Sequence, residues 1–138
     1  MRLLAVDFGE KRIGLAVSDA DGAVVVPVGA VARRNDGQAA AAVAEEARVR
    51  GVERLVVGHP VRSGGVETLL ARRARNFARR LSEVSGLPVD LHGEALTSRA
   101  ADETLERAGV PAARRAAARD AEAAAVLLRD YLAARDGP

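Results

Sequence analysis

The sequence of 138 residues contains no cysteine, no apolar run near the length of a membrane span and no polar low-complexity block. The absence of cysteine excludes disulfides and thiolate metal sites, so a metal ion would have to be held by oxygen atoms or by the two histidines. A bilayer span needs about 20 apolar residues, and the opening MRLLAVDFGE lacks the apolar stretch and cleavage site of a secretory signal. We therefore expect a cytoplasmic protein.

Lysine is nearly absent as well, since Lys11 is the single lysine among 21 basic residues. The others are arginines, whose planar guanidinium suits bidentate contact with phosphate, although an alanine- and arginine-rich composition equally reflects coding bias. Hydrophobic residues make up 49% of the chain and charged residues 29%, which is the balance of a globular protein rather than a disordered one. The length suits one domain, residues 1–138, with one core.

Five short apolar segments predict β-strands, because they are rich in β-branched residues and end at turn residues. They are Leu3–Val6, Ile13–Val17, Val24–Val28, the segment around Arg54–Val57, and GLPVDLH at residues 86–92. The first three are joined by the short connections GEKR and DADG, which predict an antiparallel meander.

Four further segments predict helices from their alanine-rich or amphipathic composition. They are Gln38–Arg50, Val66–Val84, Ser98–Ala108 and Asp120–Ala134. The second has the clearest apolar stripe, formed by Val66, Leu70, Ala74, Phe77, Leu81 and Val84. A strand meander followed by alternating helices and strands predicts an α/β fold, with a mixed sheet covered by helices on both faces.

Three acidic residues stand where α/β proteins gather their ligand sites. Asp7 ends the first predicted strand, Glu94 follows the last one, and Asp120 begins the final predicted helix. If they converge, their mutual repulsion requires a cation, and oxygen ligands favour Mg²⁺ or Mn²⁺. Asp120 as a helix N-cap and Glu94 as a solvated loop charge are the ordinary alternatives. Asp7 is harder to explain without a role, because its VDFG context leaves it little access to water.

Four sequence motifs resemble those of one known family. AVDFGEKRIGLAVSD resembles the opening motif of the YqgF family of Holliday-junction-resolvase-like proteins and pre-16S rRNA nucleases. LVVGHPVRSGG resembles the family's Val-Gly-Leu-Pro loop with His59 in place of leucine, ARNFARRL its arginine-rich helix, and RDAEAAAVLLRDYL its ending. The middle departs from the pattern, since residues 93–98 read GEALTS where the family usually has Asp-Glu-Arg-Leu-Thr-Thr.

The resemblance implies a ribonuclease H-like fold with a mixed five-stranded sheet. It also implies that Asp7, Glu94 and Asp120 are metal-binding catalytic carboxylates, which hold two Mg²⁺ or Mn²⁺ ions across the scissile phosphate, with Asp7 bridging both ions. The implied function is that of a metal-dependent nuclease for structured nucleic acid, with 5′-end processing of pre-16S rRNA as the first expectation. A Holliday junction resolvase-like endonuclease and a non-catalytic nucleic-acid- or ribosome-binding module are the alternatives. Actin-like ATPases and sugar kinases also open with an Asp-x-Gly turn, but that architecture needs two such domains.

Basic residues near these carboxylates predict contacts with phosphate groups. The expected substrate-binding residues are Lys11, Arg12 and Arg62 in loops near the site, and Arg72, Arg75 and Arg79 on the exposed face of the Val66–Val84 helix. Aromatic residues are limited to Phe8, Phe77 and Tyr131, so base stacking is scarce and recognition should rest on backbone and shape. The expected partner is structured RNA or branched DNA, bound by a monomer or a homodimer without involvement of a membrane.

Overall fold

The computed structural model describes residues 1–60, 67–94, 108–109 and 111–136, of which 94, 112, 113 and 136 are described by their backbone alone. Within these ranges the strands are β1 (Leu3–Asp7), β2 (Arg12–Ser18), β3 (Val25–Ala32), β4 (Arg54–Pro60) and β5 (Val89–Glu94). The described helices are α1 (Asp36–Val49), α2 (Leu69–Ser85) and α4 (Ala112–Asp136). No helix in this part of the chain is long and apolar enough to cross a membrane.

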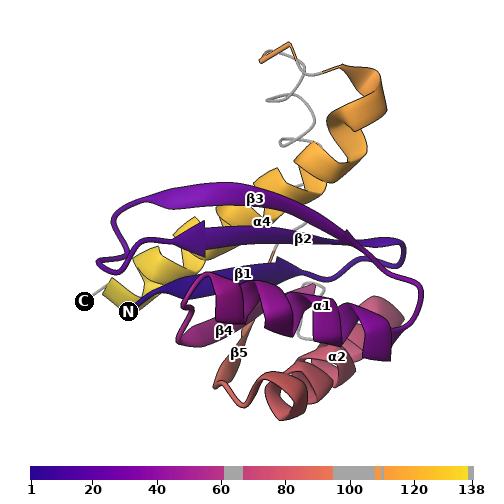
Figure 1. Ribbon diagram of the computed structural model, residues 1–138, viewed down its shortest axis with the longest axis horizontal. Helices are drawn as coiled ribbons and strands as arrows, with labels where there is room; N and C mark the ends of the chain where they lie inside the picture. The colour runs from indigo at the N-terminus through magenta and orange to yellow at the C-terminus, as the bar shows by residue number, and fades with distance from the viewer. Residues whose placement is uncertain (61–66, 95–107, 110, 137–138) are drawn as a thin grey trace.

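The strands form one sheet in the order β3-β2-β1-β4-β5 (Figure 1). β1, β2 and β3 pair antiparallel, and β4 and β5 then run parallel to β1. The predicted meander and the mixed five-stranded sheet are thereby confirmed. In this topology β1 lies at the centre of the sheet. The carboxyl ends of β1, β4 and β5 lie together at one end of the sheet, which we call the carboxyl edge.

Helices cover both faces of the sheet, as predicted, with α1 and α2 on one side and α4 crossing the other (Figure 1). Successive side chains of a strand point to opposite faces. Leu4 and Val6 of β1 accordingly pack with Phe77 and Leu81 of α2 in the first core. Leu3 and Ala5 pack with residues of α4, among them Leu128, in the second core. Asp7 follows Leu3 and Ala5 in this alternation, so it belongs to the face that α4 covers.

Helix α2 starts later than its sequence pattern predicts. Thr68 is the N-cap and accepts a hydrogen bond from the backbone of Ala71, so the first helical residue is Leu69. Val66 lies outside the described residues. Val84 is 51% exposed, so the predicted apolar stripe is wrong at its carboxyl end, where the helix extends past the sheet core. Phe77 and Leu81 are fully buried, as the stripe predicts.

Helix α4 begins at Ala112, well before the predicted start at Asp120. The alanine-rich segment before Asp120 has high intrinsic helix propensity, which carries the helix backward along the chain. Asp120 is therefore an interior helical residue, and the N-cap alternative for it is wrong. The predicted helix Ser98–Ala108 lies outside the described residues except for Ala108, which stands in a turn with Gly109.

Gly14 allows α4 to approach the sheet more closely than any larger residue would permit. A Cβ atom at Gly14 would lie 1.9 Å from the carbonyl oxygen of Asp120 and 3.1 Å from the amide nitrogen of Ala121. Both atoms belong to backbone that is held in a helix, so neither can turn aside as a side chain would. The missing side chain at Gly14 therefore sets where α4 lies on β2.

We expect Gly14→Ala to lower the free energy of unfolding by about 3 kcal/mol, because the added methyl group overlaps the α4 backbone. The measurement is urea denaturation at equilibrium. Gly37→Ala is the matched control, since its new Cβ would meet the flexible end of Arg80 at 3.2 Å, and we expect a change within about 1 kcal/mol. A Gly14→Ala protein as stable as the wild type would show that α4 does not pack against β2 in this way.

Candidate active site at the end of strand β1

Asp7 and Asp120 lie next to each other on one face of the sheet. Asp7, the last residue of β1, pairs with Gly14 of β2, and the backbone of Asp120 contacts Gly14 on the α4 face. Directly paired residues of an antiparallel ladder have Cα atoms about 5 Å apart. Both side chains are partly buried. The structure thus brings together the backbone positions of two of the three acidic residues that the sequence singles out, although they are far apart in the chain.

Arg12 forms an ion pair with Asp120. Its Nε donates to Oδ2 of Asp120 at 2.7 Å, and the two side chains are 34% and 21% exposed. Arg12 is the first residue of β2 and lies two residues before Gly14. Residues two apart on a strand point to the same face, so Arg12 lies on the face that α4 covers. The predicted phosphate-binding residue is therefore in the site, and in this structure its partner is a candidate metal ligand.

Glu94 is the last residue of β5 and pairs with Pro60 of β4. Val6 of β1 pairs with Val57 of β4, and the next residue of β4, Gly58, pairs with His92 of β5. Asp7 is therefore level with His92, and β5 extends two residues beyond β1 at the carboxyl edge. Two strand spacings separate β5 from β1, which is about 10 Å. The side chain of Glu94 lies outside the described residues, so the structure fixes the position of its backbone and not its contacts.

Three polar contacts join the part of β5 that precedes Glu94 to α4 and β4. Tyr131 of α4 donates its hydroxyl to Asp90, and Arg54 of β4 donates Nη1 to the same carboxylate at 3.0 Å. His92 and Asp130 are 2.7 Å apart through Nε2 and Oδ2. Burial, followed by the Asp90 hydrogen bond, raises the pKa of Tyr131. These contacts hold the strand that ends in Glu94 against the helix that carries Asp120.

The donor set suits a hard divalent cation, because carboxylate oxygens are the ligands that Mg²⁺ and Mn²⁺ prefer. No group of three or more histidine, aspartate or glutamate side chains is placed for metal binding within the described residues. Asp7 and Asp120 supply two carboxylates, and a third ligand would have to come from residues such as Glu94 whose side chains are not described. The chemistry of the residues present fits such an ion.

Lys11 lies in the exposed turn between β1 and β2, beside Arg12. Arg33 fixes this turn, since its backbone amide donates to the carbonyl of Lys11 at 2.8 Å and its Nη1 to the carbonyl of Glu10 at 3.0 Å. The turn is thus ordered and adjoins Asp7. Arg62, the other predicted loop residue, lies outside the described residues.

The arginines predicted on α2 form one face of that helix. Arg72, Arg75 and Arg79 are spaced by three and four residues, which places them along one side. Arg75 and Arg79 line a groove of about 330 Å³ between α2 and the edge strand β5, together with Leu91. This face is beside the strand that ends in Glu94, so it adjoins the shared carboxyl edge.

The sequence interpretation missed Glu67, which ties this face to strand β4. Arg75 donates Nε and Nη2 to the two oxygens of Glu67 at 2.8 and 3.1 Å, and His59 of β4 lies 3.2 Å from the same carboxylate. Arg75, and to a lesser extent His59, lower the pKa of Glu67 to about 2. The one sequence signal was His59 itself, which departs from the leucine usual in the resembling family.

The lowered pKa predicts how acid affects this cluster. A carboxyl group whose pKa falls from 4.5 to about 2 on folding contributes stability that is complete above 4.5 and is lost as the pH falls through 2. We therefore expect the unfolding free energy of the wild type to fall more steeply over this interval than that of Glu67→Gln, as measured by denaturant titration at each pH. Glu83→Gln is the control, because Glu83 is exposed and forms no ion pair with a described residue. Parallel curves for the wild type and Glu67→Gln would contradict the ion-pair interpretation.

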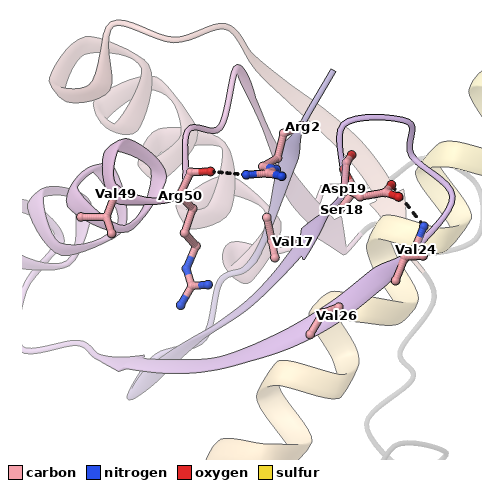
Figure 2. Close-up of a pocket in the computed structure, with 8 residues that line it drawn as sticks. All are labelled: Arg2, Val17, Ser18, Asp19, Val24, Val26, Val49 and Arg50. Carbon is pink, nitrogen blue, oxygen red and sulfur yellow. Dashed lines mark hydrogen bonds between the residues drawn. The ribbon is translucent and has the colours of Figure 1, made fainter.

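A larger groove lies at the other end of the sheet from the carboxyl edge. Its volume is about 520 Å³, and it lies between the β2–β3 hairpin and the end of α1 (Figure 2). Val24, Val26 and Val49 give it an apolar lining, and Arg2 donates to the carbonyl of Arg50 at 3.0 Å. Asp19, its one acidic lining residue, is used in accepting from the backbone amide of Val24. The groove therefore lacks the converging carboxylates of the β1 edge.

The sheet order and the helices on both faces define a ribonuclease H-like fold. RuvC of Thermus thermophilus, solved in complex with a Holliday junction substrate, superposes with a TM-score of 0.59 at 20% identity, over 99% of this chain and 97% of that one. The fowlpox virus Holliday junction resolvase gives 0.56 at 12% identity, over 97% and 99%. At these identities the likeness concerns the fold.

The family follows from the sequence comparison. Residues 1–134 match the family described as RuvX: Holliday junction resolvase, and the chain belongs to this family, also called YqgF. A relative from Anaeromyxobacter dehalogenans (strain 2CP-C) is 46% identical over 132 residues, which cover 96% of each chain. One from Syntrophus aciditrophicus is 38% identical over 132 residues, covering 96% of this chain and 88% of its own. Both bear the name "Putative pre-16S rRNA nuclease".

Proposed function

We propose that residues 1–138 form one divalent-metal-dependent nuclease domain that hydrolyses phosphodiester bonds in structured nucleic acid. The observation that carries the proposal is the contact at Gly14, which joins Asp7 and Asp120 on one face at the carboxyl edge of the sheet. Membership of the RuvX family supports the reaction class. Carboxylates that bind metal ions together repel each other, so such a pair requires a compensating positive charge.

Each residue of the site has a role in this proposal. Asp7, Asp120 and Glu94 would hold the Mg²⁺ or Mn²⁺ ions through their carboxylate oxygens. Such ions stabilise the charge of the attacked phosphate and lower the pKa of the attacking water. Arg12 and Lys11 would hold the non-bridging phosphate oxygens from the β1–β2 side, Arg12 with a planar fork and Lys11 with a compact ammonium group.

Replacing Asp7 tests the site directly. We expect Asp7→Asn to abolish Mn²⁺- and Mg²⁺-dependent cleavage, because a neutral amide binds a hard divalent cation less well than a carboxylate does, and to leave the metal-free fold at least as stable, because one negative charge is removed. A gel assay of strand cleavage and a thermal melt measure the two effects. Asp21→Asn is the matched control in the exposed β2–β3 turn and should cleave at the wild-type rate. Unfolding of Asp7→Asn would make Asp7 a structural residue and contradict the proposal.

The proposed physiological substrate is the 5′ end of pre-16S rRNA, and that role would place the protein in the cytoplasm. The names of the two relatives support this choice, while the description of the family supports a Holliday junction as the second candidate. A paired assay separates them, with a 5′-extended 16S precursor fragment and a four-way DNA junction of equal length under the same metal and salt. Cleavage at the mature 5′ end supports processing, and symmetric nicking of the junction by a dimer supports resolution. Binding of both without cleavage would leave a non-catalytic binding module.

The arginine face of α2 is the proposed track for the nucleic-acid backbone. We expect Arg72, Arg75 and Arg79, changed together to Glu, to weaken binding and to lower the slope of log K against log salt by about 2 to 3, because each phosphate contact contributes about 0.9. Fluorescence anisotropy over a salt series measures both quantities.

A second triple variant with the same charge change controls for the effect of net charge. Arg48, Arg129 and Arg135 are exposed and lie away from the α2 face, and Glu at these three positions should leave the slope almost unchanged. Equal losses in the two variants would show that the α2 face is merely solvated.

A further inference from the structure

We propose that Arg12 is a positioning residue that acts as the built-in counter-ion of Asp120, and that a divalent cation has to displace it in order to bind. The inference rests on the proposed metal site and deepens it. It starts from the hydrogen bond that Nε of Arg12 donates to Oδ2 of Asp120 at 2.7 Å.

The pair is more sheltered than the ion pairs on the outside of the helices. The side chains of Arg12 and Asp120 are 34% and 21% exposed, whereas Arg48 and Glu45 on α1 are 72% and 58% exposed. Shelter from water strengthens a charge pair and makes an unpaired partner costly. In the metal-free protein, Asp120 therefore needs Arg12.

Most donors of the Arg12 guanidinium form no hydrogen bond with the residues that the structure describes. Arginine carries five N–H groups, of which Nη1 and Nη2 hold four. Nε is the one guanidinium nitrogen of Arg12 that donates a hydrogen bond to a described residue. A guanidinium released from Asp120 can thus present its outer edge to a phosphate oxygen, and the cation that releases it compensates the carboxylate in its place.

Competition between Arg12 and the cation for the carboxylate of Asp120 lowers the apparent affinity of the protein for the metal ion. A ligand that binds only the fraction of protein in which its site is open has an apparent Kd equal to its intrinsic Kd divided by that open fraction. If Arg12 covers an oxygen of Asp120 most of the time, removal of Arg12 should tighten metal binding. An Arg12 that merely orients Asp120 for the ion would give the opposite result.

The experiment measures Mn²⁺ affinity of the full chain by isothermal titration calorimetry, without nucleic acid. We expect Arg12→Gln to lower the Kd for Mn²⁺ by about fivefold or more, to lower the melting temperature of the metal-free protein, and to reduce turnover of a nucleic-acid substrate. Arg12→Lys, which keeps a positive charge, should bind Mn²⁺ with a Kd between those of the wild type and Arg12→Gln. An unchanged or higher Kd in Arg12→Gln would overturn the inference.

Arg50→Gln is the matched control, because it makes the same change of charge at an ion pair outside the site. Arg50 pairs with Glu46 at 2.9 Å, and their side chains are 38% and 39% exposed. It should destabilise the metal-free protein while leaving the Mn²⁺ Kd at the wild-type value, and an equal gain in affinity would assign the effect to net charge and overturn the inference. A wild-type protein that binds no Mn²⁺ would instead overturn the proposed function itself, so the two failures are distinguishable.

Discussion

The contact between Gly14 and the backbone of Asp120 is the constraint on which the candidate site depends. It lies at the position in β2 that pairs with Asp7, so a single interface sets both the seating of α4 on the sheet and the approach of the two carboxylates. A larger residue at position 14 would push the helix outward and carry Asp120 with it. Packing and proposed chemistry therefore share one residue that has no side chain.

Three carboxylates of the described residues form ion pairs with basic side chains. Asp120 pairs with Arg12, Glu67 with Arg75 and His59, and Asp90 with Arg54, each across two different elements of the fold. Such pairs contribute little where they are fully solvated and more where they are sheltered. The cluster at Glu67 fastens α2 to β4 and the one at Asp90 fastens β5 to its neighbours, so both support the edge at which the proposed site lies.

The large groove at the other edge illustrates why concavity alone does not define this site. Ligand pockets are usually the largest well-formed cavities with a few converging polar groups. Here the larger groove is lined by valines, and its polar groups are used in local hydrogen bonds (Figure 2). A nucleic acid is a long polyanion, and an exposed sheet edge flanked by arginines suits it better than an apolar pocket.

The sequence by itself determined the strands, the mixed α/β class and Asp7 as the residue to explain, because alternation and turn residues are local signals. It misplaced the start of α4 at Asp120, since an alanine-rich segment extends a helix without any apolar stripe to mark it. Only the tertiary structure decided that Asp120 lies beside Asp7, that Arg12 pairs with it and that His59 meets Glu67. The contacts of Asp120 join segments that are distant in the chain, and their geometry is fixed by how closely a helix can approach a glycine in a strand.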